Sequence, residues 1–178
     1  MEFHDDAKLC QLYPPSLAAL NKAFRKTAEC PSDFMYDHQT GKCYKLIAKK
    51  ATWLDSRLAC NALGSHPVIA ASSSDTKTLI NFMELPSLAT NMTYCGYTFW
   101  SSGMGFSPPT NLTYVWRPYA TKSKDVYLPM KYTNWDLTQP DNAGGIEGFV
   151  HIKARKSANW NDLPNSNLLC VLCEVDMD

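Results

Sequence analysis

The spacing of apolar and polar positions predicts a helix that begins after residue 52. Thr52 can cap its N-terminus, and the Asp55 side chain can bond back to the cap, as in a capping box. Leu54 and Leu58 lie four residues apart and therefore share one helix face. Gly64 is a typical residue at a helix end, because glycine adopts the left-handed conformation that terminates a helix.

A second helix and several strands are predicted on either side of a long irregular stretch. This helix should begin at Ser74-Asp75 and end before Pro86, and its apolar stripe consists of Leu79, Ile80 and Met83. Residues 86–148 are rich in Pro, Gly, Asn, Ser and Thr, with short apolar pieces at Phe99-Trp100 and Tyr114-Val115-Trp116. An irregular stretch this long inside a compact domain is usually functional. Strands are predicted at residues 42–47, 149–152 and 168–174.

The chain divides into a short appendage and one domain. Residues 1–29 contain Cys10, are interrupted by Pro14-Pro15, and can form a short helix capped by Ser16. We expect this appendage to be an oligomerisation segment. The domain is expected at residues 30–178, a length that suits a single folding unit.

The charge balance and the hydropathy argue against two classes of partner. Seventeen Lys and Arg balance seventeen Asp and Glu, so no net charge favours nucleic acid or an anionic membrane surface. Hydrophobic residues make up 45% of the chain, enough for a core. No run approaches the roughly 18 consecutive apolar residues of a membrane span. We therefore expect no nucleic-acid partner and no membrane insertion.

Seven cysteines indicate an oxidising compartment. Glycosylation sequons at Asn91-Met92-Thr93 and Asn111-Leu112-Thr113 agree with secretion. The first six residues lack the positive and apolar regions of a secretory signal, so we expect a mature secreted chain. Buried free thiols are the alternative reading of the cysteines.

Two short segments near the C-terminus, Gln139-Pro140-Asp141 and Trp160-Asn161-Asp162, concentrate oxygen-bearing side chains. With Glu147 between them, the segments supply five such side chains: Gln139, Asp141, Glu147, Asn161 and Asp162. Calcium takes six to eight oxygen ligands from carboxylates, amides and carbonyls. Either segment alone is an ordinary turn or cap sequence, but together they predict a calcium site.

These segments resemble the QPD and WND motifs of C-type lectin domains of the long form. The resemblance runs from Cys30 to about Glu174, and Glu147 follows Gln139 at the spacing the family leads one to expect. The other matching residues are Trp53, Cys60, the stretch from Phe99 to Gly103, and Cys173-Glu174. The resemblance implies an α+β fold, with two helices, short antiparallel sheets and a long calcium-binding loop region.

The resemblance also implies two disulfides, Cys30–Cys43 and Cys60–Cys173. A further disulfide that is usual in the family is absent, because Phe149 and Asn165 stand at its two positions. Cys170 points to the strand face opposite Cys173, so a Cys95–Cys170 bridge can form within the domain. Cys10 would then be left for an intermolecular bond, and we expect a disulfide-linked dimer.

The five oxygen-bearing residues are implied to bind both Ca²⁺ and a sugar. In the family, the main-chain carbonyl at Asp162 also coordinates, Pro140 is in cis, and the Gln-Pro-Asp order goes with galactose-type sugars. Many galactose binders place an aromatic ring after this motif, and here Tyr132 or His151 is the candidate replacement. Positions 142 and 148 lack the carboxylates of an accessory calcium site, so one site is expected.

The resulting prediction is a secreted, calcium-dependent lectin for galactose or N-acetylgalactosamine on cell-surface or microbial glycans. The alternative is a protein-binding domain of the same fold, in which calcium only orders the loop. No nucleophile elbow, phosphate loop or cysteine–histidine signature is present, so an enzyme is not expected. The expected core includes Trp53, Trp100, Trp135 and Trp160, and the cluster of Lys153, Arg155 and Lys156 is expected to be a solvated turn.

Overall fold

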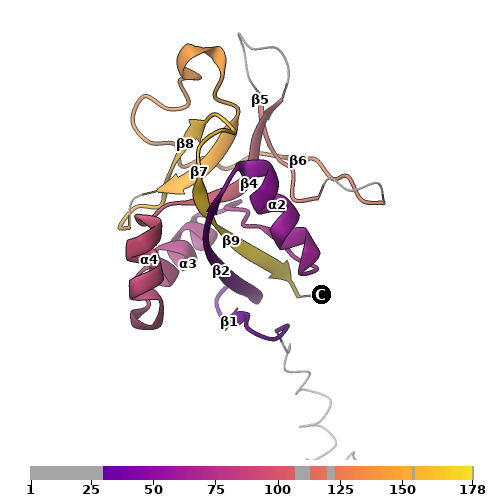
Figure 1. Ribbon diagram of the computed structural model, residues 1–178, viewed down its shortest axis with the longest axis vertical. Coiled ribbons are helices and arrows are strands. Elements are labelled where there is room, and N and C mark those ends of the chain that lie inside the picture. Colours follow the sequence, from indigo (N-terminus) through magenta and orange to yellow (C-terminus); the bar gives the residue numbers. More distant parts are fainter. Residues whose placement is uncertain (1–29, 107–112, 120–122, 154, 178) are drawn as a thin grey trace, which may run out of the picture.

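The last strand of the chain, β9, lies at the centre of the sheet. β9 (Leu169–Asp176) pairs antiparallel with β2 (Lys42–Ala51) and β3 (His66–Pro67), and parallel with β4 (Phe99–Phe106). β1 (Met35–Asp37) extends the sheet beyond β2. The first two strands and the last strand of the domain therefore lie side by side, as Figure 1 shows.

A second group of strands continues from β4 and carries the long connections. β4 pairs antiparallel with β5 (Thr113–Trp116) and β7 (Phe149–Lys153). β5 pairs with β6 (Leu128–Pro129), and β7 pairs with β8 (Asn159–Leu163). In Figure 1, β7, β8 and the loop before them form the upper part of the molecule, away from β1 and the C-terminus.

The computed structural model describes residues 30–106, 113–119, 123–153 and 155–177. The predicted appendage with Cys10, and the sequon at Asn111, lie outside these ranges. Within them, no helix has both the length and the apolar character needed to cross a membrane.

Helix α2 (Trp53–Ala62) begins where the sequence predicts. The Thr52 side chain accepts a hydrogen bond from the Asp55 backbone N–H at 3.1 Å and donates to the Asp55 carboxylate at 2.7 Å. Leu54 and Leu58 share a face, but that face is the exposed one, with 43% and 49% of each residue accessible. The buried face consists of Trp53, Ser56, Arg57 and Cys60.

Helix α3 (Ser73–Met83) begins one residue earlier than predicted, with Ser72 as its N-cap. It buries Leu79 and Met83, as the stripe predicts, and Phe82 with them. Ile80 is only partly buried and packs at the edge of the same core.

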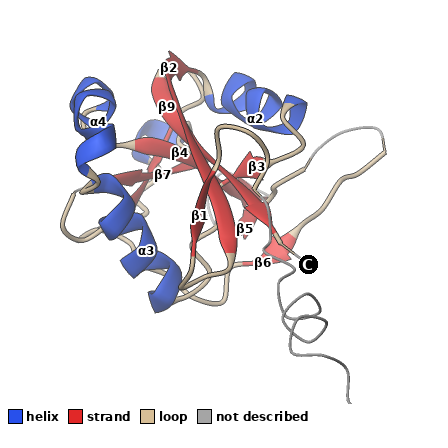
Figure 2. Ribbon diagram, turned by 90° about the horizontal axis from the view of Figure 1, so that it is seen from below, coloured by secondary structure: helices blue, strands red, loops and turns tan. Residues whose placement is uncertain are grey.

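In its described residues, the stretch predicted to be irregular contains a further helix and three strands, β4, β5 and β6. After a 3-10 turn (η1, Pro86–Leu88), helix α4 (Ala89–Cys95) ends at Gly96 in the left-handed conformation. Only Met92 and Cys95 of α4 are buried, which explains why no apolar stripe signalled it. α3 and α4 lie on one side of the β2–β9 pair, and α2 lies on the other (Figures 1 and 2).

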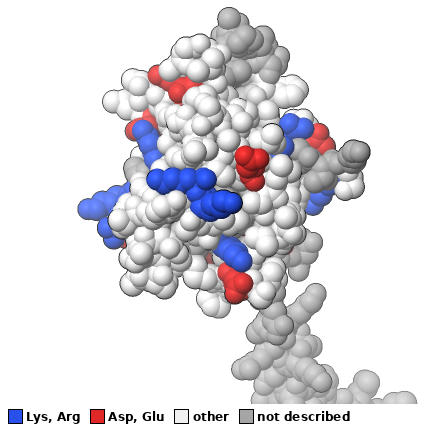
Figure 3. Space-filling view, viewed as in Figure 1, with Lys and Arg blue, Asp and Glu red and all other residues white. Residues whose placement is uncertain are grey.

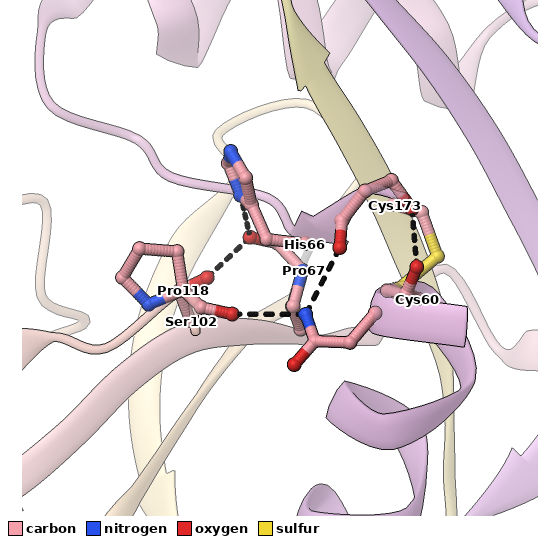
Figure 4. The surroundings of a disulfide bond; sticks show 8 residues. Cys60, His66, Pro67, Ser102, Pro118 and Cys173 are labelled. Carbon is pink, nitrogen blue, oxygen red and sulfur yellow. Dashed lines mark hydrogen bonds between the residues drawn. A yellow bond between two sulfur atoms is a disulfide. The ribbon is translucent and has the colours of Figure 1, made fainter. Parts of the chain in front are cut away.

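Three disulfides fasten the hairpin and two helices to this sheet. They are Cys30–Cys43 between the segment before β1 and strand β2, Cys60–Cys173 between α2 and β9, and Cys95–Cys170 between α4 and β9. These pairs coincide with the pairs that the sequence suggested. Figure 4 shows Cys60–Cys173 next to His66-Pro67, where the Ser102 hydroxyl donates to the Pro67 carbonyl.

A fully buried carboxylate in β9 is compensated by basic neighbours. Lys42 Nζ lies 3.0 Å from Glu174 Oε1, and His66 Nε2 lies 3.9 Å from it and 3.3 Å from Asp176 Oδ2. Burial raises the pKa of Glu174, although the Lys42 and His66 charges oppose the rise. Burial alone would lower the pKa of His66, but its bond to Asp176 and the Glu174 charge raise it overall.

Candidate metal centre

Five oxygen-bearing side chains converge beside strand β8. Gln139 and Asp141 come from the loop before η2 (Ala143–Gly145), Glu147 lies just before β7, and Asn161 and Asp162 belong to β8. One carboxylate oxygen from each of Asp141, Glu147 and Asp162 lies within 4.8 Å of the other two. The structure therefore brings together all five residues that the sequence singles out.

The Gln139 amide lies at the centre of this cluster. Its oxygen faces acceptors alone, at 2.6 Å from Asn161 Oδ1, 2.8 Å from Asp162 Oδ1 and 3.2 Å from Asp141 Oδ1. Oxygen atoms that cannot donate repel one another at such distances unless a proton or a cation lies between them. Rotating the Gln139 amide would turn the contacts into hydrogen bonds, and a cation among the oxygens would turn them into a ligand shell.

Asp162 is the anchor of the cluster. Its side chain is fully buried, and Oδ2 accepts hydrogen bonds from the Tyr114 hydroxyl at 2.6 Å and the Asn142 N–H at 2.9 Å. Its Oδ1 faces the Asp141 N–H at 3.3 Å and the Gln139 amide. Burial raises the pKa of Tyr114, and the bond to Asp162 raises it further, so the hydroxyl remains a donor. One carboxylate thus fixes both the loop backbone and a neighbouring strand.

Glu147 closes the cluster from the side of β7. Its Oε2 accepts from the Ala143 N–H at 2.9 Å, and its own N–H donates to Asn142 Oδ1 at 3.1 Å. Burial raises the pKa of the Glu147 carboxyl, and the charges of Asp162 and Asp141 add to the rise. A nearby cation would favour the ionised form of such a crowded carboxylate.

The loop conformation that aims these side chains depends on unusual backbone geometry. The Gln139–Pro140 peptide is cis, as predicted, and Thr138 and Asn142 have positive φ angles of 69° and 45°. Two backbone hydrogen bonds hold the loop to β8. The Trp160 N–H donates to the Asn134 carbonyl at 2.9 Å, and the Trp160 carbonyl accepts from the Asp136 N–H at 2.8 Å.

Trp160 supports the site from below. It is fully buried, and its ring meets those of Trp116 and Trp135 at centroid distances of 5.2 and 5.5 Å. Trp53 and Trp100 are also buried, as predicted, whereas Trp135 is only partly so. Aromatic packing therefore fixes the two β8 ligands next to Trp160 along the chain.

The donor set fits calcium better than a transition metal. It contains three carboxylates and two amides, and no imidazole or thiolate, and hard cations prefer oxygen ligands of this kind. The three negative charges exceed the charge of one divalent ion. The Asp162 carbonyl accepts from Asn161 Nδ2 at 2.8 Å, which leaves one of its lone pairs for another partner.

The two candidates for the aromatic platform are already engaged elsewhere. His151 is only 6% exposed, and its Nδ1 lies 2.7 Å from the Thr98 hydroxyl, so the expectation for His151 is wrong. The Tyr132 ring packs against Trp160 at 5.9 Å, and its hydroxyl lies 3.0 Å from Thr76 Oγ1. The residue that sequence reasoning missed is Tyr114, since 48 positions separate it from Asp162.

Comparisons with known proteins agree with this architecture, although no family model matches the chain. It is 31% identical over 137 residues to a hemolymph lipopolysaccharide-binding protein of Periplaneta americana, which covers 75% of this chain. The chain spans about half the length of that relative, 49%. It is 24% identical over 148 residues to a C-type lectin mannose-binding isoform of Oxyuranus scutellatus, with 82% of each chain covered.

Solved structures show the same fold. The C-type lectin CEL-I from Cucumaria echinata superposes with a TM-score of 0.64 at 18% identity, covering 84% of this chain and 99% of that one. A calcium-independent type II antifreeze protein superposes with a TM-score of 0.62 at 17% identity, covering 84% and 96%. Since a Ca²⁺-dependent type II antifreeze protein also superposes, with a TM-score of 0.58 at 18% identity, the fold occurs with and without calcium dependence. The solved structures show that this chain has the fold of a C-type lectin domain, and curated relatives that are named as C-type lectins agree with it.

Proposed function

We propose that this protein is an extracellular lectin that binds sugars through a calcium ion held by Gln139, Asp141, Glu147, Asn161 and Asp162. The observation that carries the proposal is the convergence of the Asp141, Glu147 and Asp162 carboxylates, one oxygen of each lying within 4.8 Å of the other two. A calcium ion among these oxygens would offset their mutual repulsion. Curated relatives that are C-type lectins support the coarser part of the proposal, sugar binding.

The side chains divide the work of holding the ion and the sugar. A calcium ion bound here with incomplete protein coordination would take two neighbouring sugar hydroxyls as ligands. The carboxylates of Asp141 and Glu147 would accept hydrogen bonds from those hydroxyls, and the amides of Gln139 and Asn161 would donate to them. Buried Asp162 fixes the relative positions of these side chains, because its two oxygens accept hydrogen bonds from the backbone N–H groups of Asp141 and Asn142 in the loop.

The order of donor and acceptor groups favours galactose-type sugars. Gln139 places an amide where mannose binders of the family carry a carboxylate, and Asp141 places a carboxylate where they carry an amide. The name of the snake relative, a mannose-binding isoform, points the other way. The two sugar classes therefore need to be compared directly.

Two exposed aliphatic side chains neighbour the candidate ligands in the sequence. Ile146, directly before Glu147, is 68% exposed, and Leu137, two residues before Gln139, is 88% exposed. We assign them to the apolar face of the sugar or to an attached lipid. A bacterial glycolipid is one such target, since an insect relative is named for binding lipopolysaccharide.

The remaining parts of the proposal concern location and assembly. The three disulfides suit an extracellular protein, and Asn91 is an exposed acceptor in α4 for an N-linked glycan. Cys10 would join two chains. A dimer would raise the avidity for sugars whose monovalent affinity is weak.

Retention on immobilised galactose and on immobilised mannose, each in calcium and then in EDTA, tests this function. We expect retention on galactose resin and release by EDTA. The matched variant exchanges the two groups, Gln139→Glu with Asp141→Asn, which conserves charge and should move retention to mannose. Retention of the unaltered chain on mannose alone would refute the galactose assignment. The absence of calcium-dependent retention on either resin or on lipopolysaccharide would refute the lectin proposal and favour the protein-binding alternative.

A further inference from the structure

A cavity lies between helix α2, strands β4 and β7, and the segments that follow β5 and β8. Its volume is about 250 Å³. Its lining residues are Trp53, Leu54, Arg57, Met104, Arg117, Phe149 and Asn165. None of them belongs to the oxygen cluster, so the cavity is distinct from the candidate metal centre. Its walls are mainly apolar and include two guanidinium groups.

The cavity lies between the two positions at which a usual disulfide of the family is missing. The Phe149 ring packs on Trp53 at a centroid distance of 4.6 Å. Asn165 Oδ1 accepts from the Leu54 N–H at 3.1 Å, at the start of α2. These contacts attach the segments of Phe149 and Asn165 each to helix α2, and the cavity lies among these residues.

Arg57 is the unusual residue of this cavity. It is only 5% exposed, and its Nε and Nη1 are buried without a hydrogen-bond partner. Its guanidinium lies over the Trp53 ring at 4.6 Å, a cation–π contact that compensates only part of the lost hydration. A buried charge normally has an ionic partner, because an unpaired one is costly. No described residue forms a salt bridge with Arg57.

Arg117, the second arginine that lines the cavity, does not balance the unpaired charge of Arg57. Arg117 is bonded to Asp125 through Nε and Nη2, both at 3.0 Å, so its own charge is matched. Burial lowers the pKa of Arg57, and the Arg117 charge lowers it further. Two cations and one carboxylate therefore leave one net positive charge beside the cavity.

We propose that this cavity is a binding site for a small organic anion that carries one acidic group on an apolar body. Arg57 pairs with the acidic group, and Trp53, Met104 and Phe149 contact the apolar part. The Asn165 amide nitrogen, whose oxygen is already used by Leu54, offers a further donor. The site requires neither calcium nor a sugar, so it stands independently of the proposed lectin activity.

The charges beside the cavity favour a small ligand over a polyanion, because only one net positive charge remains there after Arg117 pairs with Asp125. On the face seen in Figure 3, basic and acidic side chains both occur. The cavity is also smaller than the roughly 300 to 1,000 Å³ of sites for drug-sized ligands. A ligand with one acidic group on a ring or a short chain matches both the charge and the volume of the cavity.

Isothermal titration of the full chain in EDTA with 2-naphthoate, and with neutral 2-naphthalenemethanol, tests the proposal. We expect saturable binding of the acid and binding of the alcohol at least tenfold weaker. Arg57→Met should weaken naphthoate binding by at least tenfold. The matched control is Arg155→Met, which removes an exposed arginine that lies over Tyr97 in a comparable cation–π contact. It should leave naphthoate binding unchanged.

A second variant keeps the test decisive if Arg57→Met does not fold. Leu54→Trp enlarges a half-exposed side chain at the cavity wall, keeps Arg57, and should fill the space and abolish binding. Thermal unfolding of each variant verifies the fold. The proposal is overturned if naphthoate does not saturate, if the alcohol binds equally well, or if a folded Arg57 or Leu54 variant binds naphthoate as the unaltered chain does.

Discussion

The two halves of this domain are held together by different means. The half built from β1, β2, β9 and the three helices contains all three disulfides. The half built around β5 to β8 carries the oxygen cluster, and the chain has no cysteine between Cys95 and Cys170. Hydrogen bonds to Asp162 and the packing around Trp160 hold that second half.

Because of this difference, the stability of the domain and the proposed binding of ligands depend on different halves of the molecule. Disulfides stabilise mainly by restricting the unfolded chain, so they fix the first half whatever is bound. In the proposed lectin, a calcium ion would neutralise the three carboxylates of the loop half. Under that proposal, calcium should order the second half further and leave the first almost unaffected.

The largest effect on the free energy of unfolding is expected from the removal of a disulfide. Removing Cys60–Cys173 with Cys60→Ala and Cys173→Ala releases a loop of 113 residues and should cost about 4 kcal/mol of unfolding free energy. Removing Cys30–Cys43, with a separation of 13, should cost about 1 to 2 kcal/mol less. Urea unfolding measures both, and an equal or reversed order would contradict the loop-entropy explanation.

The next effect concerns the anchor of the oxygen cluster. Asp162→Asn keeps the shape but removes a buried charge, so calcium affinity should fall by about 100-fold or more. The control is Asp136→Asn, because Asp136 lies in the same loop but pairs with Lys153 at 2.7 Å. Calorimetric calcium titration measures both variants. Comparable losses of calcium affinity in the two variants would show that the overall negative charge of the loop attracts the ion, and that the oxygen cluster does not bind it specifically.

A smaller effect should follow from loss of a supporting hydrogen bond. Tyr114→Phe removes the donor at 2.6 Å from Asp162 and should weaken calcium binding by about tenfold, the usual effect of losing such support. Tyr94→Phe, on an exposed ring of α4, should have no effect. If Tyr114→Phe binds calcium normally, Asp162 is held in position by its backbone contacts alone.

The smallest effect belongs to the disulfide-bonded half and depends on pH. Because contacts with Asp176 and Glu174 raise the pKa of His66, the stability that its charged form contributes is fully present below about pH 6.5. That contribution is lost as pH rises through the raised pKa. The unfolding free-energy difference between the unaltered chain and His66→Gln should therefore be larger at pH 5.5 than at pH 8.5. A difference that grows with pH would contradict the assigned ion pairs.

The sequence predicted those parts of the structure whose signals are local. The Thr52 cap and the cysteines with their fixed neighbours lie within a few residues of the features they specify. The candidate ligands were likewise recognisable because two three-residue segments contain four of them. Their convergence required only that β8 pass next to the loop.

Features that depend on tertiary packing could not be predicted in this way. The spacing of Leu54 and Leu58 showed that they share a face, but not that the Trp53 and Arg57 side would be the buried one. Helix α4 buries too few residues to produce a periodic pattern. The link between Tyr114 and Asp162 joins strands that are distant in sequence.

The pairing of β1 and β2 with β9 has a practical consequence. In Figure 1 the first strand and the C-terminus lie in the lower half of the molecule, and the loop with the oxygen cluster lies at the opposite end. A tether, a fluorescent fusion or a sensor surface attached at either end of the domain would leave the cluster facing outward. Copies attached to a support by this end of the domain would each keep the oxygen cluster on the side away from the attachment point.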